Sequence, residues 1–175
     1  MSGDEFVNDQ INHKRVVIVI ERKINYMSEN RNKESDFKIK LVYHDLEGNV
    51  STEGVWAAKE GEYYRIKNAP FFAPNLSYND LISVEEDEGE LFFDSLIEPS
   101  GHTTIQIIFF KAEFVDQVTE DLIKFNCDWE GSHVKRYISV DIPKTVDYSE
   151  VRKYLNQKCE EGVLDFKEAC LAHEV

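Results

Sequence analysis

The order of elements in the last third of the chain limits its possible folds more than any other feature. Segments rich in β-branched and aromatic residues predict strands, and two segments between them place apolar residues at helical spacing. Asp147 or Ser149 can cap the second helix, and Gly162 is suited to end it. The order strand–helix–strand–strand–helix–strand predicts a ferredoxin-like, split βαβ arrangement. These elements are expected at residues 103–110, 113–126, 127–130, 137–142, 147–161 and 163–166.

The middle of the chain predicts a β-rich lobe. From Phe37 onward, short segments alternate apolar and polar residues, as strands with one buried face do. Turns are expected at residues 47–49 and 60–61, and an acidic turn at residues 85–90. Two prolines four residues apart exclude a regular strand or helix interior from residues 68–74. The strands are expected at residues 37–43, 50–59, 63–67, 81–84 and 91–93.

The 175 residues fit one domain or two small lobes. Residues 1–36 are expected to be a partly ordered N-terminal extension, because the strand-like run Val16–Ile20 is followed by a polar segment, 28–36, without apolar anchors. Residues 37–99 form the β-rich lobe, and residues 100–175 form the ferredoxin-like lobe, which is expected to share its core. The fold class is therefore α+β.

The net charge of the chain limits the classes of partner that it can bind. The chain carries 20 Lys and Arg against 34 Asp and Glu, a net charge of −14, which argues against binding to nucleic acid or to an anionic membrane. Residues 37–99 alone carry a net charge of −8. The run at 85–90 lacks the spacing of a calcium loop, and its carboxylates repel one another unless a partner answers them. We therefore predict a basic protein partner, with a solvated hairpin tip as the open alternative. The predicted partner-binding residues are Glu85, Glu86, Asp87, Glu88 and Glu90.

The sequence offers little for a membrane, a metal or a disulfide. No basic, apolar signal segment begins the chain and no apolar run approaches the roughly 20 residues of a membrane span, so a cytoplasmic location is expected. The three cysteines then read as reduced thiols. Cys127 with His133, or Cys170 with His173, would make a zinc site without the usual C-x-x-C pair. We therefore expect no metal and no cofactor.

Aromatic residues gather in the segment 68–74. They could line a small-ligand pocket, or Phe71 and Phe72 could fill the seam between the two lobes. Ser100 and His102 suggest a nucleophile and a base, but they are too close in sequence to face each other, and a turn that opens the next strand is the simpler interpretation. No catalytic residue is predicted, and the chain is expected not to be an enzyme. The possible pocket residues are Trp56, Phe71, Phe72, Tyr78, Asp80, Ser100 and His102.

Several short motifs occur in a recognisable order. They are W-A-A at 56–58, E-Y-Y-R-I-K-N-A-P-F-F-A at 62–73, S-Y-N-D-L-I-S-V at 77–84 and S-G-H-T-T-I-Q-I at 100–107. In this order they resemble the bacterial domain-of-unknown-function family 4265, over roughly residues 37–166. The family often has an Arg where this chain has Gln106. The resemblance implies a bacterial origin and carries no established activity.

Three functions remain open. The first is a binding protein, in its concrete form an immunity or inhibitor protein that neutralises a bacterial toxin by covering a basic surface. The second is a small-molecule-binding protein or enzyme that uses the aromatic residues around Trp56, Phe71, Phe72 and His102. The third is a regulator that pairs with another protein through the sheet edge at Val16–Ile20.

Overall fold

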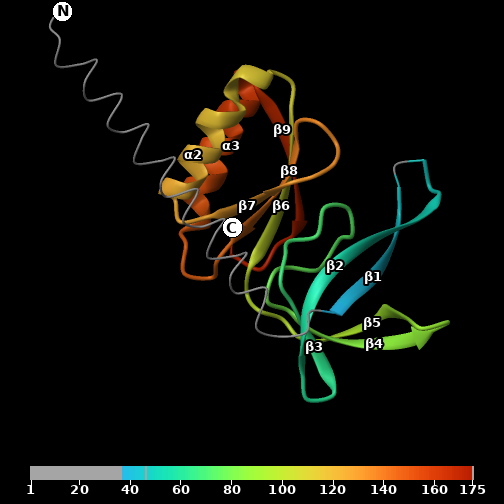
Figure 1. Cartoon of the computed structure of the whole chain (residues 1–175). Helices are drawn as coiled ribbons and strands as arrows, with labels where there is room; N and C mark the ends of the chain where they lie inside the picture. Colours follow the sequence, from blue (N-terminus) through green and yellow to red (C-terminus); the bar gives the residue numbers. More distant parts are fainter. Residues whose placement is uncertain (1–36, 46, 175) are drawn as a thin grey trace, which may run out of the picture. The chain divides into compact units, whose positions relative to one another are not determined.

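The computed structural model describes residues 37–45 and 47–174 (Figure 1). The strand expected at Val16–Ile20 and the linker expected at 28–36 lie outside the described residues.

Residues 37–98 form a closed five-stranded barrel. Consecutive strands are antiparallel, and β1 pairs in parallel with β5 through Ile39 with Leu91 and Lys40 with Phe92, which closes the barrel. Alternation along β1 turns Ile39 and Leu41 inward and leaves Lys38 exposed. The strands are β1 (Phe37–His44), β2 (Val50–Glu60), β3 (Tyr63–Ile66), β4 (Leu81–Asp87) and β5 (Glu90–Glu98).

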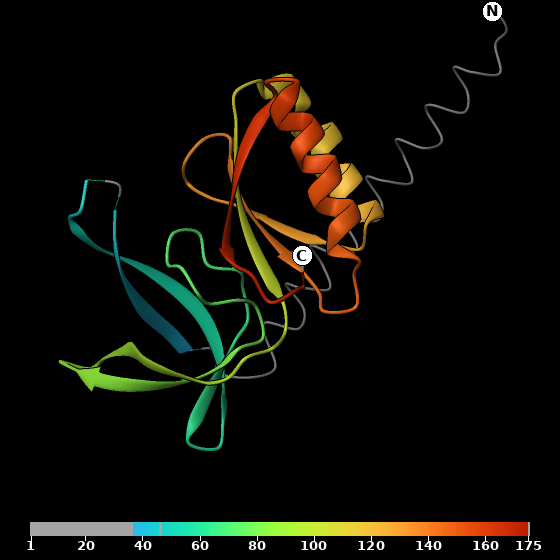
Figure 2. The same ribbon diagram turned by 180° about the vertical axis from the view of Figure 1, so that it is seen from behind.

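Residues 103–170 form a four-stranded sheet with two helices on one face, as Figures 1 and 2 show from opposite sides. The strand order is β7-β8-β6-β9, and every neighbouring pair is antiparallel. The elements are β6 (Thr103–Phe109), η1 (Ala112–Phe114), α2 (Val115–Lys124), β7 (Asp128–Gly131), β8 (Tyr137–Ile142), α3 (Tyr148–Glu160) and β9 (Leu164–Cys170). With the barrel, this confirms the α+β class.

The two helices begin and end for identifiable reasons. The carboxylate of Asp147 accepts the Ser149 N–H at 3.0 Å and caps α3, and Gly162 has the positive φ of +64° that ends it, both as predicted. The first helix is shorter than expected. A 3₁₀ turn precedes α2, and Asn126, with φ of +62°, stands just past its end and stops it.

Several strands are longer than predicted. β5 continues from Phe93 through Glu98, and β9 continues from Phe166 through Cys170, because backbone pairing with β4 and with β6 extends beyond the apolar pattern that marked each strand. The expected acidic turn at 85–90 is mostly strand. Only Glu88 and Gly89 form the turn, and both have positive φ, as a tight two-residue hairpin requires.

Two hydrophobic cores replace the single shared core that we expected. The barrel core and the sheet–helix core have no residue in common. Stacked aromatic rings and polar contacts link them. The polar contacts arise because the sheet face turned away from the helices carries polar side chains such as Thr104 and Ser139. The barrel core holds Ile39, Leu41, Val55, Ala57, Tyr64, Ile66, Ala73, Leu76 and Ile82. The sheet–helix core holds Ile105, Ile107, Phe109, Val118, Leu122, Cys127, Ile138, Val140, Ile142, Tyr148, Val151, Leu155, Val163 and Leu164.

Candidate functional site

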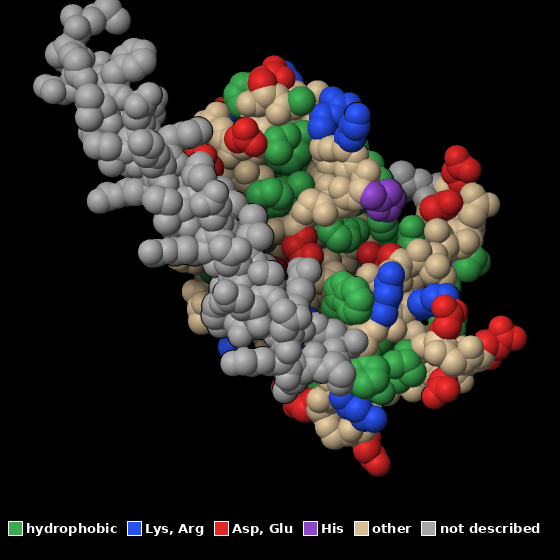
Figure 3. Space-filling model, in the orientation of Figure 1, with side chains coloured by type: hydrophobic (Ala, Val, Ile, Leu, Met, Phe, Trp, Pro, Cys, Tyr) green, Lys and Arg blue, Asp and Glu red, His purple; other side chains and the backbone are tan. Residues whose placement is uncertain are grey.

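The five carboxylates of the predicted partner-binding run lie together on the β4–β5 hairpin. All five residues are exposed. Strand register places Glu86 opposite Leu91 and Asp87 opposite Glu90, so the acidic residues occupy the last rungs of a paired ladder. Figure 3 shows Asp and Glu side chains projecting around the ends of these strands. We call Glu86, Asp87 and Glu88 the acidic tip.

Among residues 37–45 and 47–174, only part of this negative charge is paired with a cation. The Lys40 ammonium forms an ion pair with Glu90 and lies 5.4 Å from the centre of the Phe92 ring. Among the described residues, none forms a hydrogen bond or ion pair with a side chain of the acidic tip. Unanswered carboxylates on one short hairpin repel each other and create a negative potential that attracts a cationic surface.

A second cluster centres on Glu53, which the sequence did not identify. The Glu53 carboxylate accepts the backbone N–H groups of Phe71 and Phe72, each at 2.8 Å, and that of Ala73. Three donors on one carboxylate fix the irregular segment 67–80 against β2. The signal was not available in the sequence, since the donors are backbone groups 18 to 20 residues away.

Phe72 connects the barrel to the sheet. Its ring stacks on Tyr43 of β1 and on Tyr137 of β8, with 5.5 Å between ring centres in each case. The Tyr137 hydroxyl donates to the carbonyl of Phe71 at 2.7 Å. Burial, with the nearby Glu53 charge, raises the pKa of Tyr137 to about 12. These are the contacts of a segment that fills a seam.

A third cluster lies where the chain leaves the barrel and enters β6. Buried Asp80 accepts the backbone N–H groups of Ser77 and Ser100, each at 2.7 Å. The Ser100 hydroxyl accepts the N–H of His102, and Gly101 has φ of +80°, which confirms the expected turn. The ring of Tyr78 lies 5.6 Å from that of His102.

His102 also has an acidic partner that the sequence did not reveal. Its Nδ1 lies 2.8 Å from a carboxylate oxygen of Asp141, and the two side chains are 15% and 10% exposed. Asp141 stands opposite Thr104 in the β6–β8 register, so the sheet itself brings the pair together across 39 residues. Such a pair can hold one imidazole tautomer and orient the ring.

The seven predicted pocket residues therefore fall into three neighbourhoods. Phe71 and Phe72 lie at the Glu53 cluster. Trp56 lies on the outer face of β2, where it is 45% exposed, and its backbone N–H donates to Asn68. The residues at the Asp80 turn are Tyr78, Asp80, Ser100 and His102.

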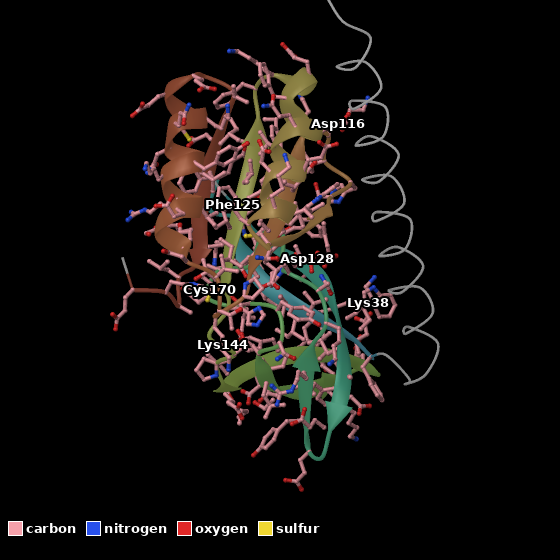
Figure 4. All side chains as sticks on the ribbon, turned by 90° about the vertical axis from the view of Figure 1, so that its left-hand side faces the viewer. Lys38, Asp116, Phe125, Asp128, Lys144 and Cys170 are labelled. Carbon is pink, nitrogen blue, oxygen red and sulfur yellow. The ribbon has the colours of Figure 1, made fainter. Side chains whose placement is uncertain are left out.

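The cysteines and histidines take separate places in the described chain. Cys127 is buried in the sheet–helix core, and His133 lies against the ring of Phe72. Burial is the main cause that raises the pKa of the Cys170 thiol, labelled in Figure 4, and His173 binds Thr103 and the Pro143 carbonyl. Within residues 37–45 and 47–174, no group of three His, Cys, Asp or Glu side chains is arranged to hold a metal ion.

Comparisons with known proteins identify relatives but no activity. The model of the family described as domain of unknown function DUF4265 matches residues 53–166. A crystal structure of a hypothetical protein from Neisseria gonorrhoeae is 30% identical, covers 82% of this chain and 100% of its own, and superposes with a TM-score of 0.73. No curated protein matches the chain. Among the described residues, no helix is long and apolar enough to cross a membrane.

Proposed function

The chain belongs to the DUF4265 family. Because that family name leaves the activity open, we propose a function from the surface chemistry. The protein is a non-enzymatic binding protein that covers a basic surface of another protein, as an immunity or inhibitor protein does when it neutralises a bacterial toxin. It acts in the cytoplasm, as the sequence predicts.

One observation carries this proposal: the acidic tip is exposed and its side chains have no hydrogen bond or ion pair to any residue that the structure describes, yet it is built on a paired hairpin with a two-residue turn. A rigid presentation lowers the conformational entropy that binding would otherwise cost. An exposed cluster of one sign also steers a partner of the other sign and raises the association rate above the unsteered 10⁵–10⁶ M⁻¹s⁻¹, by order of magnitude.

We also propose that residues 103–170 are a ferredoxin-like unit. The element order β6-α2-β7-β8-α3-β9, with β6 and β8 in the centre of the sheet, supports this assignment. Within the proposed function this lobe is the support for the barrel. It fixes the segment 67–80 through Tyr137 and Ser139, each of which donates to a loop carbonyl at 2.7 Å.

The test is a capture experiment with three immobilised proteins. The first is the wild type. The second has a neutral tip, Glu86→Gln with Asp87→Asn and Glu88→Gln. The third is a matched control that loses the same number of charges away from the hairpin, through Glu113→Gln, Glu120→Gln and Glu160→Gln.

Bacterial lysate is passed over each protein and the retained proteins are identified by mass spectrometry. We expect the wild type and the control to retain one or more basic proteins. We expect the neutral-tip variant not to retain them. Equal retention by all three proteins would contradict the proposal.

The His102–Asp141 pair favours a second candidate, a small-molecule site at the Asp80 turn. A carboxylate that orients an imidazole beside the ring of Tyr78 is an arrangement that can bind a polar ligand. A thermal-shift screen against metabolites tests it: a ligand at 100 times its dissociation constant adds about 2.7 kcal/mol to the free energy of unfolding. Loss of that shift in His102→Gln supports the site, and no shift with any metabolite contradicts it.

A further inference from the structure

The barrel and the sheet–helix lobe are joined by a single crossing of the described chain. The barrel ends with β5 at Glu98 and the sheet begins with β6 at Thr103, so residues 99–102 are the covalent connection. Gly101, within this connection, has φ of +80°. Each lobe has a hydrophobic core of its own, and the two cores share no residue. The lobes can therefore separate without unfolding, because neither core has to be broken.

The segment 67–80 belongs to the barrel side of the contact between the lobes. Its Ala73 lies in the barrel core, and three of its backbone N–H groups donate to Glu53 of β2. It meets the sheet through the stack of Phe72 on Tyr137 and through hydrogen bonds with polar side chains. Water can replace such hydrogen bonds, so they hold two surfaces together less firmly than a shared apolar core does.

Gln106 destabilises this contact. Its side chain is 5% exposed and lies on the sheet face that the segment covers, since it stands opposite Ser139 in the β6–β8 register. The hydroxyls of Ser139 and Thr104 beside it both donate to groups of the segment. Among the described residues, the buried Nε2 of Gln106 has no hydrogen-bond partner. A buried amide nitrogen without an acceptor loses the hydrogen bonds that water would give it, so it disfavours the closed contact.

We propose that the barrel, together with the segment 67–80, moves away from the sheet about residues 99–102, and that Gln106 sets the population of this open state. In the open state the Gln106 amide reaches water while both hydrophobic cores stay folded. The Phe72–Tyr137 stack and the hydrogen bonds around it favour the closed state, and the unpaired amide opposes them. The motion does not use the acidic tip, so its test is independent of the proposed function.

One backbone N–H group reports this motion directly. The Asn75 N–H of the segment donates to the Ala169 carbonyl of β9 at 2.8 Å, across the contact between the lobes. The Phe72 N–H donates to Glu53 at 2.8 Å and stays within the barrel side. Opening therefore frees the Asn75 N–H for exchange with solvent deuterium and leaves the Phe72 N–H bonded.

Native-state hydrogen exchange, followed by NMR on the full chain, tests the proposal. In the wild type, we expect the protection factor of the Asn75 amide to be smaller than that of the Phe72 amide by about ten-fold or more. Gln106→Leu and Gln106→Met each replace the amide with an apolar group of similar size, and each should raise the protection factor of Asn75 by about ten-fold. Gln117→Leu, the same change at an exposed position of α2, is the matched control and should leave this protection factor unchanged.

Two results would overturn the proposal. If Asn75 and Phe72 are equally protected in the wild type, the lobes open only when the chain unfolds. If the protection factor of Asn75 is the same with Gln106→Leu or Gln106→Met as in the wild type, the unpaired amide has no part in the opening. Circular dichroism shows whether each variant folds, and two variants are used so that a failure of one to fold leaves the other to decide.

Discussion

The barrel and the sheet–helix lobe use their residues differently. The sheet–helix lobe packs two helices on its sheet and buries 14 residues in its core, whereas the barrel core has nine and includes two alanines. Both lobes expose some large apolar residues, such as Val50 of the barrel and Phe110 of the sheet–helix lobe, but the barrel carries the acidic tip. We propose a division of labour in which the sheet–helix lobe supplies most of the stability and the barrel supplies the surface that meets other molecules.

The largest expected effect compares the two cores directly. Leu155 of α3 and Leu41 of β1 are both fully buried. Leucine-to-alanine changes cost about 2–5 kcal/mol, according to how far the surroundings can collapse. We expect Leu155→Ala near the upper end, because helix and sheet pack on both sides of it, and Leu41→Ala near the lower end. Urea unfolding measures both, and an equal or reversed order would contradict the division of labour.

A smaller effect is expected where the two halves join. Glu53→Ala leaves three backbone N–H groups without their carboxylate, and hydrogen bonds to charged groups contribute about 1.5–3 kcal/mol. We expect a loss of about 2 kcal/mol in the free energy of unfolding. Glu62→Ala, at an exposed position in the turn between β2 and β3, is the control and should change stability by less than about 0.5 kcal/mol. Equal effects of the two substitutions would show that the segment does not depend on Glu53.

Alkaline pH tests the same junction. The pKa of Tyr137 is about 12 in the folded chain against 10.0 for an unperturbed tyrosine, so the folded state keeps a proton that the unfolded state loses. Stability should therefore fall as pH rises from 10 to 12. Tyr137→Phe should reduce this fall and should cost about 1 kcal/mol at neutral pH for its lost hydrogen bond. Urea unfolding at several pH values measures the free energy of unfolding. If this free energy falls between pH 10 and 12 as steeply in the variant as in the wild type, the raised pKa of Tyr137 is contradicted.

The smallest effect on stability is expected at the acidic tip. The neutral-tip variant should change the free energy of unfolding by less than about 0.5 kcal/mol, and toward greater stability, because it removes repulsion between exposed carboxylates. Thermal unfolding of this variant beside the wild type measures the change. A clear loss of stability would mean that the tip is structural, and a binding role would lose its main support.

The sequence predicted the bounds of an element well where a pattern of buried apolar residues ends at a residue that stops a strand or a helix. The strand at 137–142 has the predicted bounds, because alternating apolar residues end at Pro143. The cap of α3 at Asp147 and its end at Gly162 were predictable for the same reason. β5 was underestimated because its second half, from Asp94 to Glu98, is exposed and held by pairing with β4. The local pattern of apolar residues indicates which side chains are buried, but it does not indicate how far two strands pair.

The site clusters were less predictable, because distant chain segments build them. The exposed acidic run could be placed on a hairpin from sequence alone. The Glu53 carboxylate binds backbone groups that no side-chain pattern marks, and Asp141 meets His102 only through the β6–β8 register. Trp56 was one residue of the possible pocket with Phe71 and Phe72, and strand alternation turns it to the outer face of the barrel.

The most direct test of the central claim is the association rate constant for a basic protein retained in the capture experiment, measured by stopped flow over a range of ionic strengths. We predict that this rate constant falls by about ten-fold or more with added salt for the wild type and for the matched control with Glu113→Gln, Glu120→Gln and Glu160→Gln. We also predict that the neutral-tip variant has a smaller association rate constant at low ionic strength, and that this rate constant depends only weakly on salt. If the neutral-tip variant shows the same rate and the same salt dependence as the control, the acidic tip does not guide binding.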